Sequence, residues 1–310
     1  MLLNFFRSPF SAIRLFLLPA AVTALLLLAG CDREPQGPVL KIGYMNCNNE
    51  QETMQRFAPL TRYLSEQAGV RFEAVPVDTQ DFEGRFKSGE FALTHTNSLL
   101  YIVLQHNADL RLVAADKRGH FGSRSAGTLI ARKDSGIKTL EDIRGKRLVF
   151  GPAMAPTGYL AQYDLMLNAG IDPETDLSYY AIPSGSFKHE KVLYGLYFGA
   201  FDVAAAPALD LELMAADGKI NPDDFVVLAQ SPVIPYCTFG SSADLDPAIL
   251  AMVRKALLGL KTQDTVEIDG ERVKVLQSAW VEGFEELLDS DYDIIRDMAR
   301  RTNMPPYQTF

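Results

Sequence analysis

The sequence predicts an α/β fold of two lobes with a ligand cleft between them. Strand-like and helix-like segments alternate as β-α-β-α-β-α-β from Val39, which is typical of a mostly parallel sheet covered by helices. The same order begins again near Ala126 without any repeat of the sequence itself. A tail after Ser231 carries few strands of its own, so we expect it to return to the first lobe. Two lobes joined by two crossovers form a hinged cleft.

The elements of the first lobe follow from hydrophobic periodicity. Strands are expected over 39–45, 70–77, 91–96 and 109–116, and helices over 49–69, 81–90 and 97–106. Pro59 either kinks the first helix or opens its second part, and Asn97 is placed to cap the third. We expect this lobe to comprise residues 39–125 and 236–310.

The second lobe is expected over residues 126–235. Strands are predicted over 126–133, 177–183, 201–206 and 224–231, a short helix and a strand within 134–151, and helices from Thr157 to Gly170, over 186–198, and up to about Ala216. In the tail, helical stretches are predicted over 246–262 and 280–302, with a hairpin between them around Asp269-Gly270.

Charge and length limit the function classes. The chain has 310 residues, enough for one or two domains, and a formal net charge of −9. General nucleic-acid binding needs a basic face, so this charge argues against it.

The N-terminus indicates export and a lipid anchor. Residues 15–28 form an apolar stretch that is too short for a comfortable membrane span but suits a signal-peptide core. The following Leu-Ala-Gly-Cys resembles a bacterial lipobox, which makes residues 1–30 a lipoprotein signal peptide and Cys31 the lipidated first residue. An ordinary cleaved signal and an uncleaved anchor helix are the alternatives. Asp32 resembles an inner-membrane retention signal, and residues 31–38 read as a polar tether.

Four motifs in the second lobe resemble one family. "RKDSGIKTLEDIRGKRLVFGPAMAPTGYL" is followed by "AGIDP", then by "SFKHEKVLYGLYFGAFDVAA" with thirteen residues from His189 to Asp202, then by "SPVIP". Together they resemble the solute-binding lipoproteins of phosphate, phosphite and phosphonate ABC importers, over roughly residues 40–260. The resemblance implies a type II periplasmic-binding fold, no catalysis, no cofactor, and delivery of a small oxyanion to a membrane permease. We expect a monomer held at the periplasmic side of the inner membrane.

The resemblance also implies a binding site, with departures. The family's Ser-Thr-Ser-Gly at the loop-to-helix junction corresponds to Ala155–Gly158, so only Thr157 keeps a hydroxyl. We expect Thr157 to be the helix N-cap and to hold a ligand oxygen together with the amides of Gly158 and Tyr159 and the helix dipole. His95 takes the place of a family Tyr, and His189 matches the family's His.

Ligands in such folds bind beyond the carboxyl ends of strands, which adds further candidates. The expected ligand-binding residues are Tyr44, Asn46, Cys47, Thr94, His95, Thr96, Thr157, Gly158, Tyr159, His189 and Asp202. Asp202 is either an acid of the cleft or a residue that caps a turn.

Sulfur and imidazole groups make the expected cleft unusual. A possible soft-ligand set consists of Cys47, His95, His189 and Cys237. Met45 and Met154 are expected to add thioether sulfur to the same lining. The two cysteines form a disulfide, remain separate buried thiols, or bind ligand; the sequence leaves these alternatives open.

An enzyme and a sensor are the two function classes that stand as alternatives to transport. An enzyme lacks support, because the chain shows no nucleophile triad order, nucleotide loop or zinc-protease motif. A lipid-anchored sensor for arsenite or copper that signals to a histidine kinase has the same fold and the same cleft, and it is the alternative function.

Overall fold

The structure, a computed structural model, describes residues 39–183 and 188–309. The predicted signal peptide, the lipidation site Cys31 and the tether lie outside the described residues. Within those described ranges, no helix combines the length and the apolar composition that a membrane span requires.

The first lobe is built on a six-stranded sheet. Its strands are β1 (Leu40–Met45), β2 (Phe72–Val77), β3 (Leu93–Thr96), β4 (Arg111–Lys117), β12 (Thr238–Ser241) and β15 (Gly283–Glu285). Their order is β15-β4-β12-β3-β1-β2. The strands β1, β2 and β3 are parallel, whereas β12 lies antiparallel between β3 and β4, and β15 lies antiparallel at the edge. The sheet is therefore mixed, because the tail contributes two strands that local periodicity did not reveal.

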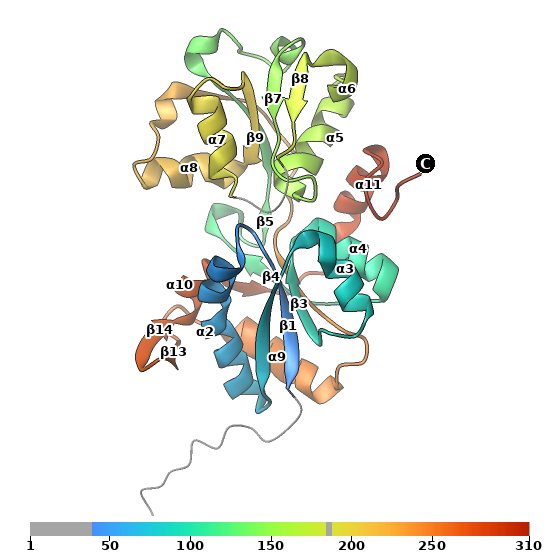
Figure 1. The fold of residues 1–310 in the computed structure, drawn as a ribbon, viewed down its shortest axis with the longest axis vertical. Helices are drawn as coiled ribbons and strands as arrows, with labels where there is room; N and C mark the ends of the chain where they lie inside the picture. Colours follow the sequence, from blue (N-terminus) through green and yellow to red (C-terminus); the bar gives the residue numbers. More distant parts are fainter. Residues whose placement is uncertain (1–38, 184–187, 310) are drawn as a thin grey trace, which may run out of the picture. The chain divides into compact units, whose positions relative to one another are not determined.

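Side chains that alternate along the strands feed two hydrophobic cores, one on each face of this sheet. Ile42 and Tyr44 belong to one core and Met45 to the other. Figure 1 shows α2 beside the sheet in the first lobe. One core is covered by α2 (Glu50–Ala68), α9 (Pro247–Gly259) and α10 (Val275–Ala279), and the other by α3 (Thr79–Lys87), α4 (Ser98–Ala108) and α11 (Asp293–Arg301).

In this lobe, local sequence signals predicted most of the helix ends and turns. Helix α2 runs through Pro59, and the Asn97 side chain caps α4 by accepting from the Leu100 amide. The predicted hairpin is formed by β13 (Thr265–Ile268) and β14 (Glu271–Lys274). Its turn residues Asp269 and Gly270 have φ of 51° and 83°, as a two-residue turn of this kind requires.

The second lobe is built on a five-stranded sheet. Its strands are β6 (Gly127–Arg132), β7 (Arg147–Val149), β8 (Tyr179–Ala181), β9 (Val203–Pro207) and β10 (Phe225–Gln230). They lie in the order β10-β6-β9-β7-β8, and β6 is antiparallel to both of its neighbours. The helices are α5 (Ala161–Asn168), α6 (Pro173–Asp176), α7 (Glu190–Tyr197) and α8 (Ala208–Ala216). The expected start of α7 at Ser186 lies outside the described residues.

Two short strands mark the crossovers between the sheets. β5 (Arg124–Ser125) and β11 (Ile234–Pro235) pair antiparallel with each other and belong to neither large sheet. The hydroxyl of Ser231 accepts from the backbone N–H of Gly127 at 3.0 Å, which ties the two crossing segments together. A pair of strands of this kind is a natural place for a hinge.

The prediction of one long helix over 280–302 is wrong for the first half of that range. Trp280 has a positive φ of 60° and ends α10, after which β15 pairs with β4, and only α11 is α-helical. The pairing of β15 with a strand about 165 positions earlier is a tertiary contact, which overrides the local helical pattern.

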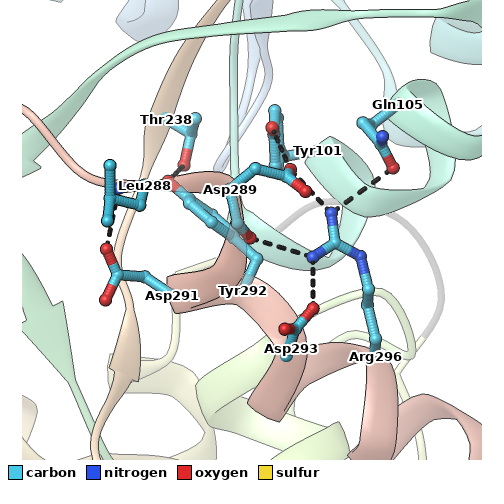
Figure 2. Close-up of polar contacts among 9 residues, drawn as sticks. All are labelled: Tyr101, Gln105, Thr238, Leu288, Asp289, Asp291, Tyr292, Asp293 and Arg296. Carbon is cyan, nitrogen blue, oxygen red and sulfur yellow. Dashed lines mark hydrogen bonds and ion pairs between the residues drawn. The ribbon is translucent and has the colours of Figure 1, made fainter.

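A polar cluster fixes the segment that precedes α11, as Figure 2 shows. The Arg296 guanidinium pairs with Asp289 at 2.7 Å and with Asp293 at 2.8 Å. Tyr101 of α4 donates to Asp289 at 2.9 Å, and the hydroxyls of Tyr292 and Thr238 share a 2.7 Å hydrogen bond. These contacts attach residues 288–296 to α4 and β12.

Candidate functional site

A cavity of about 470 Å³ lies at the carboxyl ends of strands from both sheets. In the first lobe its lining follows β1, β3 and β4 and precedes β12, and in the second lobe it comes from the loop before α5, the start of α7, and α8. The volume falls within the range of small-molecule sites.

Polar contacts join the two lobes beside the cavity. The Asn97 amide donates to the backbone carbonyl of Met154 at 2.8 Å. The Lys188 ammonium pairs with Glu52 at 2.8 Å. The two lobes are thus in contact across the cavity in this structure.

The loop-to-helix junction differs from its prediction. Thr157 is not an N-cap: it lies inside a π-helical turn, Pro156–Leu160, that begins after Ala155. The amides of Gly158 and Tyr159 both donate to the Ala155 carbonyl, at 3.4 and 3.0 Å, so they are not free to hold an anion. Among the described residues the Thr157 hydroxyl has no hydrogen-bond partner, and Thr157 lines the cavity.

His189 lies on the wall opposite the first lobe, packed against two glycines. A Cβ built on Gly151 or on Gly158 would lie 2.7 Å from its Nδ1, so only glycine leaves room for the ring. This Nδ1 is fully buried and has no partner among the described residues, although the residue as a whole is partly exposed. Burial lowers the pKa of His189 to about 4. The imidazole is therefore neutral at pH 7, and it does not supply the positive charge that an imidazolium would.

The pKa of His189 predicts a pH dependence of stability. In the unfolded chain His189 takes up a proton near pH 6.5, whereas in the folded protein it does so only near pH 4. The stabilisation by neutral His189 is thus complete above pH 6.5, and up to about 3 kcal/mol is lost as the pH falls toward 4. We expect the difference in unfolding free energy between wild type and His189→Asn to shrink by about 2.5 kcal/mol between pH 7.5 and 4.5 in urea titrations.

Because the test compares the wild type with His189→Asn, the contributions of the other titrating groups cancel. Asp210, whose pKa burial raises to about 7, titrates in both proteins and cancels in the difference. A difference that stays constant with pH would contradict the assignment to His189.

His95, Asp116 and the cysteines lie together on the first lobe. His95 Nε2 lies 2.9 Å from Asp116 Oδ2, and both residues are buried. Cys47 and Cys237 are free thiols at the cavity, so the disulfide alternative does not describe this structure. Burial, reinforced by the charge of Asp116 and by Cys47, raises the pKa of the Cys237 thiol well above its usual value.

Two guanidinium groups at the cavity escaped the sequence prediction. Arg56 stacks over the Trp280 ring at 4.3 Å and donates to the Ala279 carbonyl at 3.0 Å, and its Nε is buried without a partner. Arg118 donates to the Tyr236 hydroxyl at 3.2 Å. Within the described part of the chain, neither arginine has a carboxylate within 4.0 Å.

Most of the acids that line the cavity, by contrast, contact a basic side chain. Glu52 pairs with Lys188, and Asp116 lies against His95. Glu190 and Asp217 both pair with Lys219 at 2.9 Å. The remaining acid, Asp210, is partly protonated at pH 7 because burial raises its pKa to about 7. Arg56 and Arg118 are thus left without a carboxylate in ion-pair contact among the described residues, although Asp210 interacts electrostatically with Arg118.

The structure divides the predicted residues into two groups. Those at the cavity are Asn46, Cys47, His95, Thr157 and His189, together with Met45, Met154 and Cys237. Those away from its lining are Tyr44, Thr94, Thr96, Gly158, Tyr159 and Asp202. The soft-ligand set is also split, since His189 belongs to the second lobe and the other three members to the first.

The positions of the residues outside the lining have simple geometric causes. Tyr44 points into the core and shares a hydrogen bond with Thr61, because side chains alternate along β1. Thr94 and Thr96 are fully buried in β3, and Tyr159 packs on Phe150. Asp202 precedes β9 and pairs with Arg147, so it lies at the amino end of the strand, away from the cavity.

Some of the missed residues carried a usable signal. Asp116 and Arg118 stand at the carboxyl end of β4, where the rule that selected candidates after β1 and β3 applies equally. Arg56 had no such signal, because a charged residue on an amphipathic helix is most often simply solvated.

Comparisons with known proteins agree with this geometry. Residues 42–292 match the model of the family described as ABC transporter, phosphonate, periplasmic substrate-binding protein. The solved structure of PhnD1 from Prochlorococcus marinus with methylphosphonate superposes with a TM-score of 0.72 and 17% identity, covering 86% of this chain and 98% of that one. A binding protein component of a phosphonate ABC transporter from Pseudomonas aeruginosa superposes with a TM-score of 0.69 and 19% identity, covering 86% of this chain and 87% of that one. These structures support the two-lobed α/β fold.

A further relative belongs to a different functional class. The tetrathionate sensor histidine kinase TtrS of Salmonella typhimurium is 29% identical over 231 residues, which is 70% of this chain. The match spans only 38% of that kinase's length. Because the family model covers most of this chain, the chain belongs to the periplasmic substrate-binding proteins of phosphonate ABC transporters.

Proposed function

We propose that this protein binds a small oxyanion of the phosphate, phosphite or phosphonate type between its lobes and delivers it to an ABC permease. It acts without catalysis, as a monomer attached to the inner membrane through a lipid on Cys31. Incorporation of labelled fatty acid by the wild type and not by Cys31→Ala tests the anchor. The two β-strands that cross between the sheets act as the hinge for closure.

Arg56 and Arg118 line the cavity without a carboxylate within 4.0 Å among the described residues, and this is the observation that supports an anionic ligand. Guanidinium presents several N–H donors in a plane and suits the oxygens of phosphonates and related anions. The Trp280 ring keeps the Arg56 head group in place, so less entropy is lost on binding. The free Thr157 hydroxyl adds a neutral donor from the other lobe.

Titration calorimetry of Arg56→Gln tests this proposal. The ligands are phosphate, methylphosphonate, thiosulfate and tetrathionate, and the tightest of them is carried forward to the variant. Loss of one charged hydrogen-bond donor is expected to lower the affinity roughly ten- to a hundredfold.

The matched control is Arg62→Gln on the same helix. Arg62 is exposed and pairs with Glu66, away from the cavity. The affinity of the Arg62→Gln variant for the same ligand should therefore equal that of the wild type. Unchanged affinity in Arg56→Gln, with the fold intact by circular dichroism, would contradict the proposal.

A second candidate is a lipid-anchored sensor subunit for a sulfur oxyanion, working with a histidine kinase. Two observations favour it: the similarity to a tetrathionate sensor kinase, and sulfur atoms from Met45, Cys47, Met154 and Cys237 in the lining. The same titrations separate the candidates, since this one predicts that tetrathionate or thiosulfate binds more tightly than methylphosphonate. Neighbouring genes for a kinase rather than for a permease would agree with it.

A further inference from the structure

We propose that His95, Asp116 and Cys237 form a zinc-binding site in the wall of the cavity. Each of the three offers one ligand atom, and these atoms lie within 4.8 Å of one another. Two of them, His95 Nε2 and Asp116 Oδ2, are 2.9 Å apart. Binding of an oxyanion does not require this combination of imidazole, carboxylate and thiol, so the cluster calls for its own explanation.

The sheet holds these three residues in place. They come from β3, from β4 and from the residue before β12, and β12 lies between the other two strands. The backbone N–H of Asp116 donates to the Cys237 carbonyl at 2.9 Å, which links two of the ligands directly. Ligands on paired strands of one sheet need little reorganisation to bind a metal.

Aromatic packing also fixes the imidazole. The His95 ring lies 4.7 Å from the Phe57 ring and 4.9 Å from the Phe239 ring, measured between centroids. Phe239 is paired in register with His95 across β12 and β3. The ring therefore presents its nitrogen in one orientation, as a metal ligand should.

An unsatisfied atom indicates that a partner is missing from this cluster. Asp116 is 1% exposed, and its Oδ1 is buried without a hydrogen-bond partner among the described residues. A buried carboxylate oxygen without a partner is costly, because it has lost its water and gained nothing in exchange. A cation bound between Asp116, His95 and Cys237 would supply that partner.

The donor set selects the ion. One sulfur, one nitrogen and one oxygen suit Zn²⁺, which takes all three donor types and in many sites keeps a fourth position open. Calcium and magnesium need oxygen ligands, and Cu(I) favours sites richer in sulfur. Binding of Zn²⁺ would displace the proton of the Cys237 thiol, and the resulting thiolate and the Asp116 carboxylate would together balance the charge of the ion. All three residues line the cavity, from which water or an anion would complete the coordination.

Zinc titration of the full-length protein, reduced and stripped of metal by chelator, tests the site. We expect one Zn²⁺ per chain, and Co²⁺ in its place should show a thiolate-to-cobalt charge-transfer band. Cys237→Ser should remove the band and lower zinc affinity by about a hundredfold or more, and Asp116→Asn by roughly ten- to a hundredfold. Zinc should also raise the unfolding temperature of the wild type and not that of Cys237→Ser.

The matched control is Cys47→Ser, a free thiol of the same cavity outside the three-residue group. It should keep both the cobalt band and the zinc affinity, as should His120→Gln, which alters an exposed histidine. The proposal is overturned if the wild type binds no zinc, if binding survives Cys237→Ser, or if Cys47→Ser loses it equally. These titrations contain the metal ion and no oxyanion, so their outcome is independent of oxyanion binding. Oxyanion binding is tested separately by calorimetry of Arg56→Gln.

Discussion

Replacing Gly158 with alanine is expected to displace His189 and to destabilise the second lobe. A Cβ at this position would meet three atoms of the imidazole ring, with Nδ1 at 2.7 Å. The ring must therefore leave its position or the loop must shift. Overpacking of this kind costs about 1–3 kcal/mol of unfolding free energy. Because the ring lines the cavity, affinity for the oxyanion should fall about tenfold or more as well.

A double-mutant cycle distinguishes this clash from a general effect of alanine. In a His189→Ala background the ring is absent, so Gly158→Ala should change the unfolding free energy by only a few tenths of a kcal/mol. The matched control is Gly84→Ala within α3, where a Cβ meets nothing within 4 Å. That change should stabilise the protein by about 0.5–1 kcal/mol, because alanine is the better helix former. Equal destabilisation in both backgrounds would rule out the His189 contact as the cause.

Replacing Arg301 with alanine is expected to produce the largest loss of stability. Arg301 of α11 donates to Asp164 of α5 through Nε at 2.6 Å and Nη2 at 3.1 Å. The Asp164 side chain is only 3% exposed, so removal of the guanidinium leaves a carboxylate in a buried place with Asn168 as its remaining partner. Stranding a buried charge costs about 3–5 kcal/mol, and the lower end applies here because Arg301 itself is half exposed.

The adjacent residue provides the control for this change. Arg300 pairs with Asp297 on the surface, where both side chains are more than half exposed, and Arg300→Ala should cost no more than about 1 kcal/mol. Asp164→Asn combined with Arg301→Ala should recover part of the loss, since a neutral amide tolerates burial better than a lone charge. Urea unfolding followed by both circular dichroism and Trp280 fluorescence measures each difference. Similar costs for Arg300→Ala and Arg301→Ala would contradict the role of the buried carboxylate.

The ion pair between Arg301 and Asp164 also shows how the tail connects the lobes. Helix α11 packs on α4 of the first lobe and on α5 and the π-helical turn of the second. Closure of the cleft must keep these contacts or exchange them, so Arg301→Ala offers a way to alter hinge motion without touching the cavity.

Local sequence signals were sufficient for most elements and for part of the cavity. Hydrophobic periodicity and turn residues located the helices and strands, because these signals act over a few neighbouring residues. The rule that ligands lie at the carboxyl ends of strands, together with the family motifs, led to Asn46, Cys47, His95, Thr157 and His189, all of which line the cavity.

What the sequence could not decide depends on contacts between distant segments. The insertion of β12 between β3 and β4 brings Cys237 to His95 and Asp116, across more than a hundred positions of the chain. Which arginine lacks an ion-pair partner depends on where every acid finds its own partner, and only the folded arrangement pairs Glu52 with Lys188 while leaving Arg56 against Trp280. By itself the sequence determined the family and most of the elements, but not the strands β12 and β15. The tertiary structure decided the charges, the buried imidazole and the metal-binding group, because burial and ion pairing are properties of the surroundings of a residue and not of its neighbours in the chain.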